Sequence, residues 1–152
     1  MNPDFVDFLA ALLAEDARFL VVGAHALAVH GVPRATGDIG VWIERSPENA
    51  TRVWRALGTF GAPTESLGVQ RADFETPDVV VQIGLPPRRI DVLTGVTGLE
   101  FDEAWAGRVL HRVGELDVPF LGRDALVRNK RATGRFKDLG DLEALGEDPR
   151  PQ

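Results

Sequence analysis

The sequence predicts an α+β fold in which a mixed β-sheet is flanked by helices. Short apolar runs that are typical of strands alternate with segments whose apolar residues recur at helical spacing. Two such runs, at residues 79–83 and 89–93, are separated by a Gly- and Pro-rich stretch that favours a hairpin. No repeat, low-complexity tract or linker divides the sequence. We therefore expect residues 1–152 to form a single domain of packed sheet and helices.

The composition is typical of a globular protein without membrane spans or cysteine chemistry. The chain has 152 residues, of which 44% are hydrophobic, and this is enough for a sizeable core. No apolar run approaches the ~20 residues that span a bilayer, and no basic-then-apolar leader begins the sequence. We therefore expect a cytoplasmic protein with no membrane contact. The absence of cysteine excludes disulfides, thiolate metal sites and cysteine nucleophiles.

The charge is unevenly spread. The net charge of −6 argues against general adhesion to nucleic acid. Residues 123–137, however, hold six basic residues and one acidic residue, so this segment carries +5 and the remainder carries −11. The segment is either a solvated helix and loop or a patch that faces phosphates or a partner.

The first three elements follow from spacing and glycine positions. Helical spacing predicts a helix over 3–15, with Asn2 or Asp4 as its cap. The continuous apolar run 19–22 suits a buried strand. Residues 23–31 then indicate a short helix of small residues that a glycine stops.

Residues 36–43 indicate the central strand. Alternation places three aliphatic residues on one face and three other residues on the opposite face: Ile39, Val41 and Ile43, then Asp38, Gly40 and Trp42. A carboxylate beside an apolar strand needs a partner, a metal or water. A second metal ligand would be expected two residues on, about 6–7 Å away, and Gly40 stands there. We expect Trp42 to fill the core rather than stack on a nucleobase.

The remaining elements are predicted by periodicity and turn residues. Ser46 is the expected cap of an amphipathic helix over 46–60. Residues 61–76 read as a loop with a short helix. The later elements are strands at 79–83 and 89–93, a helix at 101–106, strands at 109–113 and 116–121, and helices at 123–133 and 137–145.

Two carboxylates and one glycine suggest phosphate chemistry. A glycine at a helix start, here Gly23, lets a phosphate approach backbone N–H groups. Asp38 could hold a divalent cation that bridges such phosphates. Asp91 is another carboxylate within an apolar strand, and both would face one cation if the two strands are neighbours. Alternatively, Asp91 pairs with Arg88 or Arg34; Arg34 is also placed to neutralise Asp38.

Other charged residues are less informative. Lys130 and Arg131 would contact a triphosphate or an acceptor, or else lie on a solvated helix face. We expect Asp141 and Glu143 on the exposed side of the last helix. The three histidines show no metal-ligand spacing, and surface or capping roles are expected for His25, His30 and His111.

Three blocks of sequence resemble a known family. They are VVGAHALAVHGVPRATGDIGVWI, PPRRIDVLTGVTG and LVRNKRATGRFKDLGDLEAL, in this order. The chain resembles the nucleotidyltransferase superfamily over about residues 17–145, and in particular the minimal nucleotidyltransferase and AbiEii-like group of small bacterial proteins. In that pattern a hydrophobic-Gly-Gly/Ser block precedes an Asp-hydrophobic-Asp pair, and a third Asp follows on a later strand.

The resemblance implies a nucleotidyltransferase-like fold with C-terminal helices. It also implies two Mg²⁺ (or Mn²⁺) ions held by three carboxylates, and transfer of a nucleoside monophosphate from an NTP to an acceptor. Asp38 and Asp91 would be the catalytic, metal-binding residues, and Gly23, Ala24 and Lys130 would bind the nucleotide. The implied partners are a nucleotide, a small helical toxin protein or an RNA or protein acceptor, and a second copy in a homo-oligomer.

The chain departs from the family pattern at two positions. Ala24 replaces the second Gly or Ser, which is a small change. Gly40 replaces the second Asp and supplies no oxygen. Glu44 shares the strand face but lies about 13 Å further along. The loss of one ligand costs several kcal/mol of transition-state stabilisation, so we predict impaired transfer. The alternative is a catalytically inactive member that acts as a binding partner in a toxin–antitoxin pair.

Overall fold

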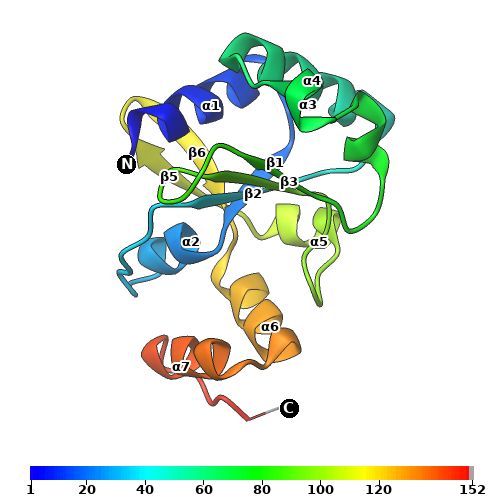
Figure 1. Cartoon of the computed structure of the whole chain (residues 1–152). Helices are drawn as coiled ribbons and strands as arrows, with labels where there is room; N and C mark the ends of the chain where they lie inside the picture. The colour runs from blue at the N-terminus through cyan, green and yellow to red at the C-terminus, as the bar shows by residue number, and fades with distance from the viewer. Residues whose placement is uncertain (151–152) are drawn as a thin grey trace.

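A six-stranded mixed sheet forms the centre of the structure, a computed structural model that describes residues 1–150 (Figure 1). Its strand order is β3-β4-β2-β1-β6-β5. Strands β2 and β4 are parallel, as are β1 and β6, and the other pairs are antiparallel. The strands are β1 (Phe19–Val22), β2 (Ile39–Ile43), β3 (Val80–Ile83), β4 (Ile90–Leu93), β5 (Val109–Val113) and β6 (Leu116–Phe120).

The helices cover both faces of this sheet. In Figure 1, α1, α3 and α4 lie over one face, α2 and α5 lie under the other, and α6 and α7 extend away below. The helices are α1 (Pro3–Ala14), α2 (Ala24–Val29), α3 (Pro47–Phe60), α4 (Thr64–Leu67), α5 (Phe101–Ala106), α6 (Arg123–Thr133) and α7 (Phe136–Ala144), with a 3-10 turn at Arg71–Glu75. The predicted α+β class is confirmed. Within residues 1–150 no helix has the length and apolar character to cross a membrane.

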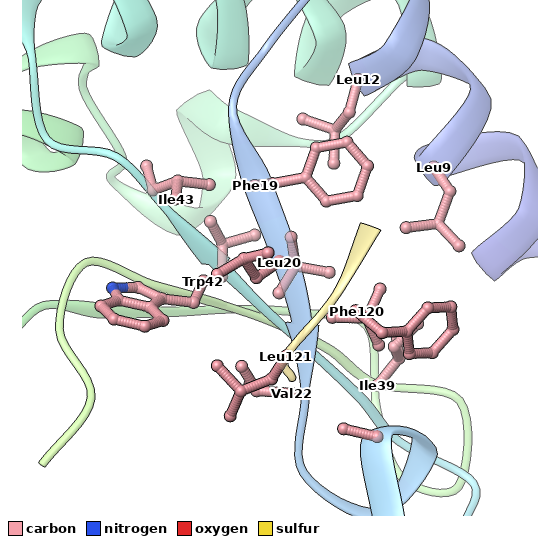
Figure 2. Packing of buried hydrophobic residues seen from close by; sticks show 14 of the residues in the cluster. Leu9, Leu12, Phe19, Leu20, Val22, Ile39, Trp42, Ile43, Phe120 and Leu121 are labelled. Carbon is pink, nitrogen blue, oxygen red and sulfur yellow. The ribbon is translucent and has the colours of Figure 1, made fainter. Parts of the chain in front are cut away.

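The two faces of β2 have the predicted division. Ile39, Val41 and Ile43 are all buried, and Ile43 is paired with Phe19 of β1. Figure 2 shows Leu12 of α1 beside Phe19, with Trp42 on the opposite side of the sheet. Trp42 is 2% exposed and meets Phe101 of α5 edge to face, at 5.1 Å between ring centres. The expectation that Trp42 fills the core is therefore confirmed.

Polar caps fix the helix starts that the sequence indicates. The Asp4 N–H donates to Asn2 Oδ1 at 2.8 Å, so Asn2 is the cap of α1. The Asn49 N–H donates to Ser46 Oγ at 3.1 Å in α3. Asn49 is itself buried, and its side-chain amide donates to the carbonyl oxygens of Arg18 and Glu44. These bonds hold α3 against the strand ends of β1 and β2.

A close backbone approach sets the start of β2. The segment before β2 passes the loop between β3 and β4 so tightly that a Cβ atom on Gly37 would overlap the carbonyl oxygen of Pro87. Just beyond this contact, the Ile39 N–H donates to the Arg89 carbonyl oxygen at 3.0 Å. The absence of a side chain at Gly37 therefore allows Asp38 to lie beside Arg89.

We predict opposite effects for two glycine substitutions. Gly37→Ala should lower the free energy of unfolding by about 1–3 kcal/mol, because the methyl group forces backbone apart. Gly58→Ala, in the last turn of α3 with no atom near its Cβ position, should raise stability by roughly 0.5–1 kcal/mol. Urea unfolding of both variants measures the difference. Equal stability of the two variants would contradict the close approach at Gly37.

Candidate active site and cationic cleft

Asp38 and Asp91 come together at the neighbouring strands β2 and β4. Gly40 is paired with Asp91 in the parallel register, and Asp38 directly precedes β2. The two carboxylates are therefore close together, as predicted, because β2 and β4 are neighbours in the sheet. Both are partly exposed, at 32% for the Asp38 side chain and 20% for Asp91.

A guanidinium lies between the two carboxylates. Arg89 Nε donates to Asp91 Oδ1 at 2.7 Å, and Arg89 Nη2 donates to Asp91 Oδ2 at 3.1 Å. Arg89 Nη2 also lies 3.4 Å from Asp38 Oδ2, and the Arg89 backbone N–H donates to Asp38 Oδ1 at 3.1 Å. The hydrogen bond to Asp91 raises the pKa of Arg89 above its usual value. Asp91 thus pairs with an arginine, the alternative considered above, but the partner is Arg89 rather than Arg88 or Arg34.

The residues present do not fit a two-metal centre. Such a centre needs three carboxylates here, and Gly40 offers no oxygen beside Asp38 and Asp91. Within residues 1–150 no group of three or more His, Cys, Asp or Glu residues is arranged to hold a metal ion. The two carboxylates that remain are already paired with a cation.

A cleft of about 870 Å³ opens on the side of the sheet that faces α6 and α7. Its residues come from the end of β1, the segment before β2, the end of β4 and the α6–α7 region. Gly23, Ala24 and Lys130, the three residues predicted to bind a nucleotide, all line it. Asp38 and Asp91 are not among its lining residues, although Leu93 at the end of the same strand is.

The charge of this cleft has one sign. Four basic residues and no acidic residue line it: Arg34, Lys130, Arg135 and Lys137. The other basic residues of the segment 123–137 lie outside and pair with acids, Arg123 and Arg131 with Glu147 and Arg128 with Glu103. The three basic residues of this segment that line the cleft are Lys130 and Arg135, which are paired with buried acids of α7, and Lys137, which is in no ion pair among the described residues.

Lys130 has a more buried position than the sequence suggested. It is 6% exposed, so it is neither on a solvated helix face nor free to extend into solvent. Its Nζ lies 3.2 Å from Asp138 Oδ1 and 3.0 Å from Asp141 Oδ2. Burial opposes ionisation of Asp138, yet hydrogen bonds from Arg135, Thr133 and Lys130 hold its pKa well below the usual range.

The expectation that Asp141 lies on the exposed side of the last helix is wrong. Asp138 and Asp141 are both fully buried where α7 packs on α6, whereas Glu143 is exposed. The sequence carried a signal for this arrangement, because Asp138, Asp141 and Leu142 recur at the i, i+3, i+4 spacing of one helix face. A leucine in that stripe indicates a buried face, and the two carboxylates share it.

Arg34 has a different partner from the one expected. Its guanidinium pairs with the buried Asp141 of α7 and not with Asp38. This ion pair joins the segment before β2 to the last helix across the wall of the cleft. Sequence spacing gave no signal for it, because the two residues are 107 positions apart.

The histidines have structural surroundings. His30 caps α2, and its Nε2 lies 2.8 Å from the Leu121 carbonyl oxygen. His111 is exposed. His25 is partly buried against Phe5, and burial lowers its pKa, so it is neutral at pH 7. The surface or capping roles expected from the sequence hold for His30 and His111, while His25 packs inside.

The comparisons with known proteins concern the fold. No family model matches the chain, and no curated protein matches it. Among solved structures, a Thermotoga maritima protein provisionally described as a nucleotidyltransferase aligns with 96% of this chain and 91% of its own. The TM-score is 0.56 and the sequence identity 12%. This likeness shows a shared fold, so the nucleotidyltransferase-like architecture predicted above is confirmed.

We predict that Lys130 is essential for stability. Lys130→Met leaves Asp138 and Asp141 buried without their shared cation, and it should lower the free energy of unfolding by about 3–5 kcal/mol. Arg128→Met is the matched control, because this residue of α6 pairs with Glu103 in solvent and should change stability by less than about 1 kcal/mol. Chemical unfolding at pH 7 compares the two. A loss at Lys130 no larger than at Arg128 would show that the cluster is dispensable.

Proposed function

We propose that this chain binds a nucleotide in its cationic cleft and that its capacity for nucleotidyl transfer is impaired. The observation that supports the proposal is a cleft of about 870 Å³ lined by four basic residues and no acidic residue. This volume is in the range of small-molecule sites. A wall of one positive sign favours a ligand with several negative charges, such as a triphosphate.

The cleft offers separate surroundings for the two parts of a nucleotide. Arg135 and Lys137 at its polar end would donate charge-assisted hydrogen bonds to phosphate oxygens. Gly23 and Ala24 carry no bulky side chain, so a phosphate can approach the backbone there. Apolar residues from the sheet, α2 and the loop after β4 would contact the sugar and base: Val22, Leu27, Leu93 and Val96.

Impaired transfer follows from the carboxylates. Gly40 removes one of the three acidic side chains that the nucleotidyltransferase pattern requires, and Arg89 occupies the two that remain. Lys137, the one cleft cation without an ion pair among the described residues, would contribute positive charge to the phosphates, with the exposed guanidinium of Arg135 beside it. We therefore expect nucleotide binding to persist without Mg²⁺ or Mn²⁺. RNA or protein acceptors should receive no nucleotide above background.

Charge reversal in the cleft tests this proposal. The wild type should bind ATP in the presence of EDTA, and Lys137→Glu should weaken binding by about tenfold or more, since ~1.4 kcal/mol corresponds to a factor of ten. Lys137 is exposed on α7, so this variant should keep the wild-type stability. Isothermal titration calorimetry with ATP, GTP, CTP and UTP measures both binding and nucleotide preference.

The control is a charge reversal on the opposite face of the sheet. Arg55 is exposed on α3, and Arg55→Glu changes the net charge by the same amount without touching the cleft. Its affinity for ATP should equal that of the wild type. Equal weakening by both variants would indicate a general charge effect, and no binding at millimolar ATP would rule out the nucleotide site.

A second candidate function is a binding role in a toxin–antitoxin pair. The missing carboxylate at Gly40 favours it, because a chain that acts through a partner needs no intact catalytic set. The expected partner is a small all-helical protein encoded next to this chain. Co-expression of the neighbouring reading frame with a tagged copy of this chain should then give a stable complex at gel filtration. Separate elution of the two proteins would exclude this partner.

A further inference from the structure

The pairing of Asp38 and Asp91 with Arg89 places one cation against both carboxylates. Arg89 contacts both oxygens of Asp91 through its guanidinium, at 2.7 and 3.1 Å. It contacts one oxygen of Asp38 through the backbone N–H and the other through Nη2, at 3.1 and 3.4 Å. Arg89 therefore contacts all four oxygens of the two side chains, three through hydrogen bonds and one through an ion-pair contact. A divalent metal ion placed between these carboxylates would be repelled by the guanidinium unless the Arg89 side chain moved away.

The backbone holds Arg89 in this position. The Ile39 N–H donates to the Arg89 carbonyl oxygen, while the Arg89 N–H donates to the Asp38 side chain. Arg89 directly precedes β4, which is paired with β2. Both backbone polar groups of Arg89 are thus hydrogen-bonded to residues at the start of β2. On an extended chain, residues 89 and 91 also lie on the same face, which directs the guanidinium toward Asp91.

Position 40 has room for the missing carboxylate. A Cβ atom on Gly40 would lie 3.1 Å from Val22 Cγ2 and 3.5 Å from Leu93 Cδ1, so a side chain fits after a small movement of the valine. Gly40 is paired with Asp91 in the register. A carboxylate introduced at position 40 would therefore lie beside an existing pair of acids that already has a cation.

We propose that Arg89 is a resident cation which replaces a divalent metal ion at Asp38 and Asp91, so that this chain excludes metal for two independent reasons. The loss of the carboxylate at Gly40 is one reason, and the guanidinium is the other. Restoring the carboxylate alone leaves the site closed to metal, because the added negative charge also holds Arg89 more firmly. The inference does not depend on what occupies the cleft.

Four proteins test the proposal: the wild type, Gly40→Asp, Arg89→Gln and the double variant. Arg89→Gln removes the charge and retains the backbone N–H that binds Asp38. Mn²⁺ binding is measured without nucleotide, by the electron paramagnetic resonance signal of the free ion. The double variant should bind Mn²⁺ at least roughly tenfold more tightly than any of the other three, because only there are three carboxylates free.

The matched control is Gly40→Asp combined with Arg88→Gln. Arg88 is the exposed neighbour of Arg89, so this protein has the same net charge as the double variant and retains the guanidinium. It should bind Mn²⁺ as weakly as Gly40→Asp alone. Equal Mn²⁺ affinity of Gly40→Asp and the double variant would overturn the proposal, and so would weak binding by a folded double variant.

A second measurement decides the question if the double variant does not fold. In ¹⁵N-labelled Gly40→Asp, the Arg89 Nε–H signal should exchange slowly with water and should not be broadened by millimolar Mn²⁺. Selective broadening of that signal would place the metal at the pair and contradict the proposal. Because no nucleotide is present in either experiment, failure here leaves the nucleotide-binding proposal to its own test at Lys137.

Discussion

A buried ion cluster joins α6, α7 and the segment before β2 at one wall of the cleft. Asp138 and Asp141 are fully buried, and their ionised carboxylates are compensated by Lys130, which lies within 3.2 Å of both, together with Arg135 at Asp138. Arg34 reaches Asp141 from the other wall. Buried apolar residues of α6 and α7, among them Leu126 and Leu142, also pack in the core. The cleft is therefore formed jointly by the sheet, by this apolar packing and by the ion cluster.

The division of charge in this region explains how an acidic protein can present a basic site. The net charge is −6, yet the four charged residues on the cleft wall are all basic. Two of the neutralising carboxylates lie behind the wall, in the protein, and do not face the cleft. An anionic ligand would thus meet three cations that are already paired with buried carboxylates and one, Lys137, that is in no ion pair among the described residues.

Much of the fold was readable from the sequence because its signals are local. Alternation in residues 39–43, the caps Asn2 and Ser46, and the glycine breaks set the elements to within a few residues. The adjacency of Asp38 and Asp91 followed from placing their strands side by side. Arg89 was overlooked, although it shares a strand face with Asp91 two residues away. That spacing was a usable local signal.

The remaining differences have physical causes that a single sequence does not expose. Charged side chains are usually exposed, so a sequence pattern favours surface positions for Lys130 and Asp141. Both are buried here because their opposite charges compensate each other. Arg34 was assigned to the nearest acid along the chain, whereas its partner is 107 residues away. Contacts between residues so far apart in sequence depend on how complete helices and strands pack together. Local sequence patterns do not predict them.

The ion pair between Arg34 and Asp141 has a consequence for biosynthesis. A chain leaves the ribosome from its N-terminus, and the central strands β1, β2 and β4 are complete well before α7 is made. Until α7 is made, the guanidinium of Arg34 on one wall of the cleft has no Asp141 with which to pair. The cleft is thus completed only after α7 has been made, so no molecule that needs the whole cleft can assist the early folding of the nascent chain.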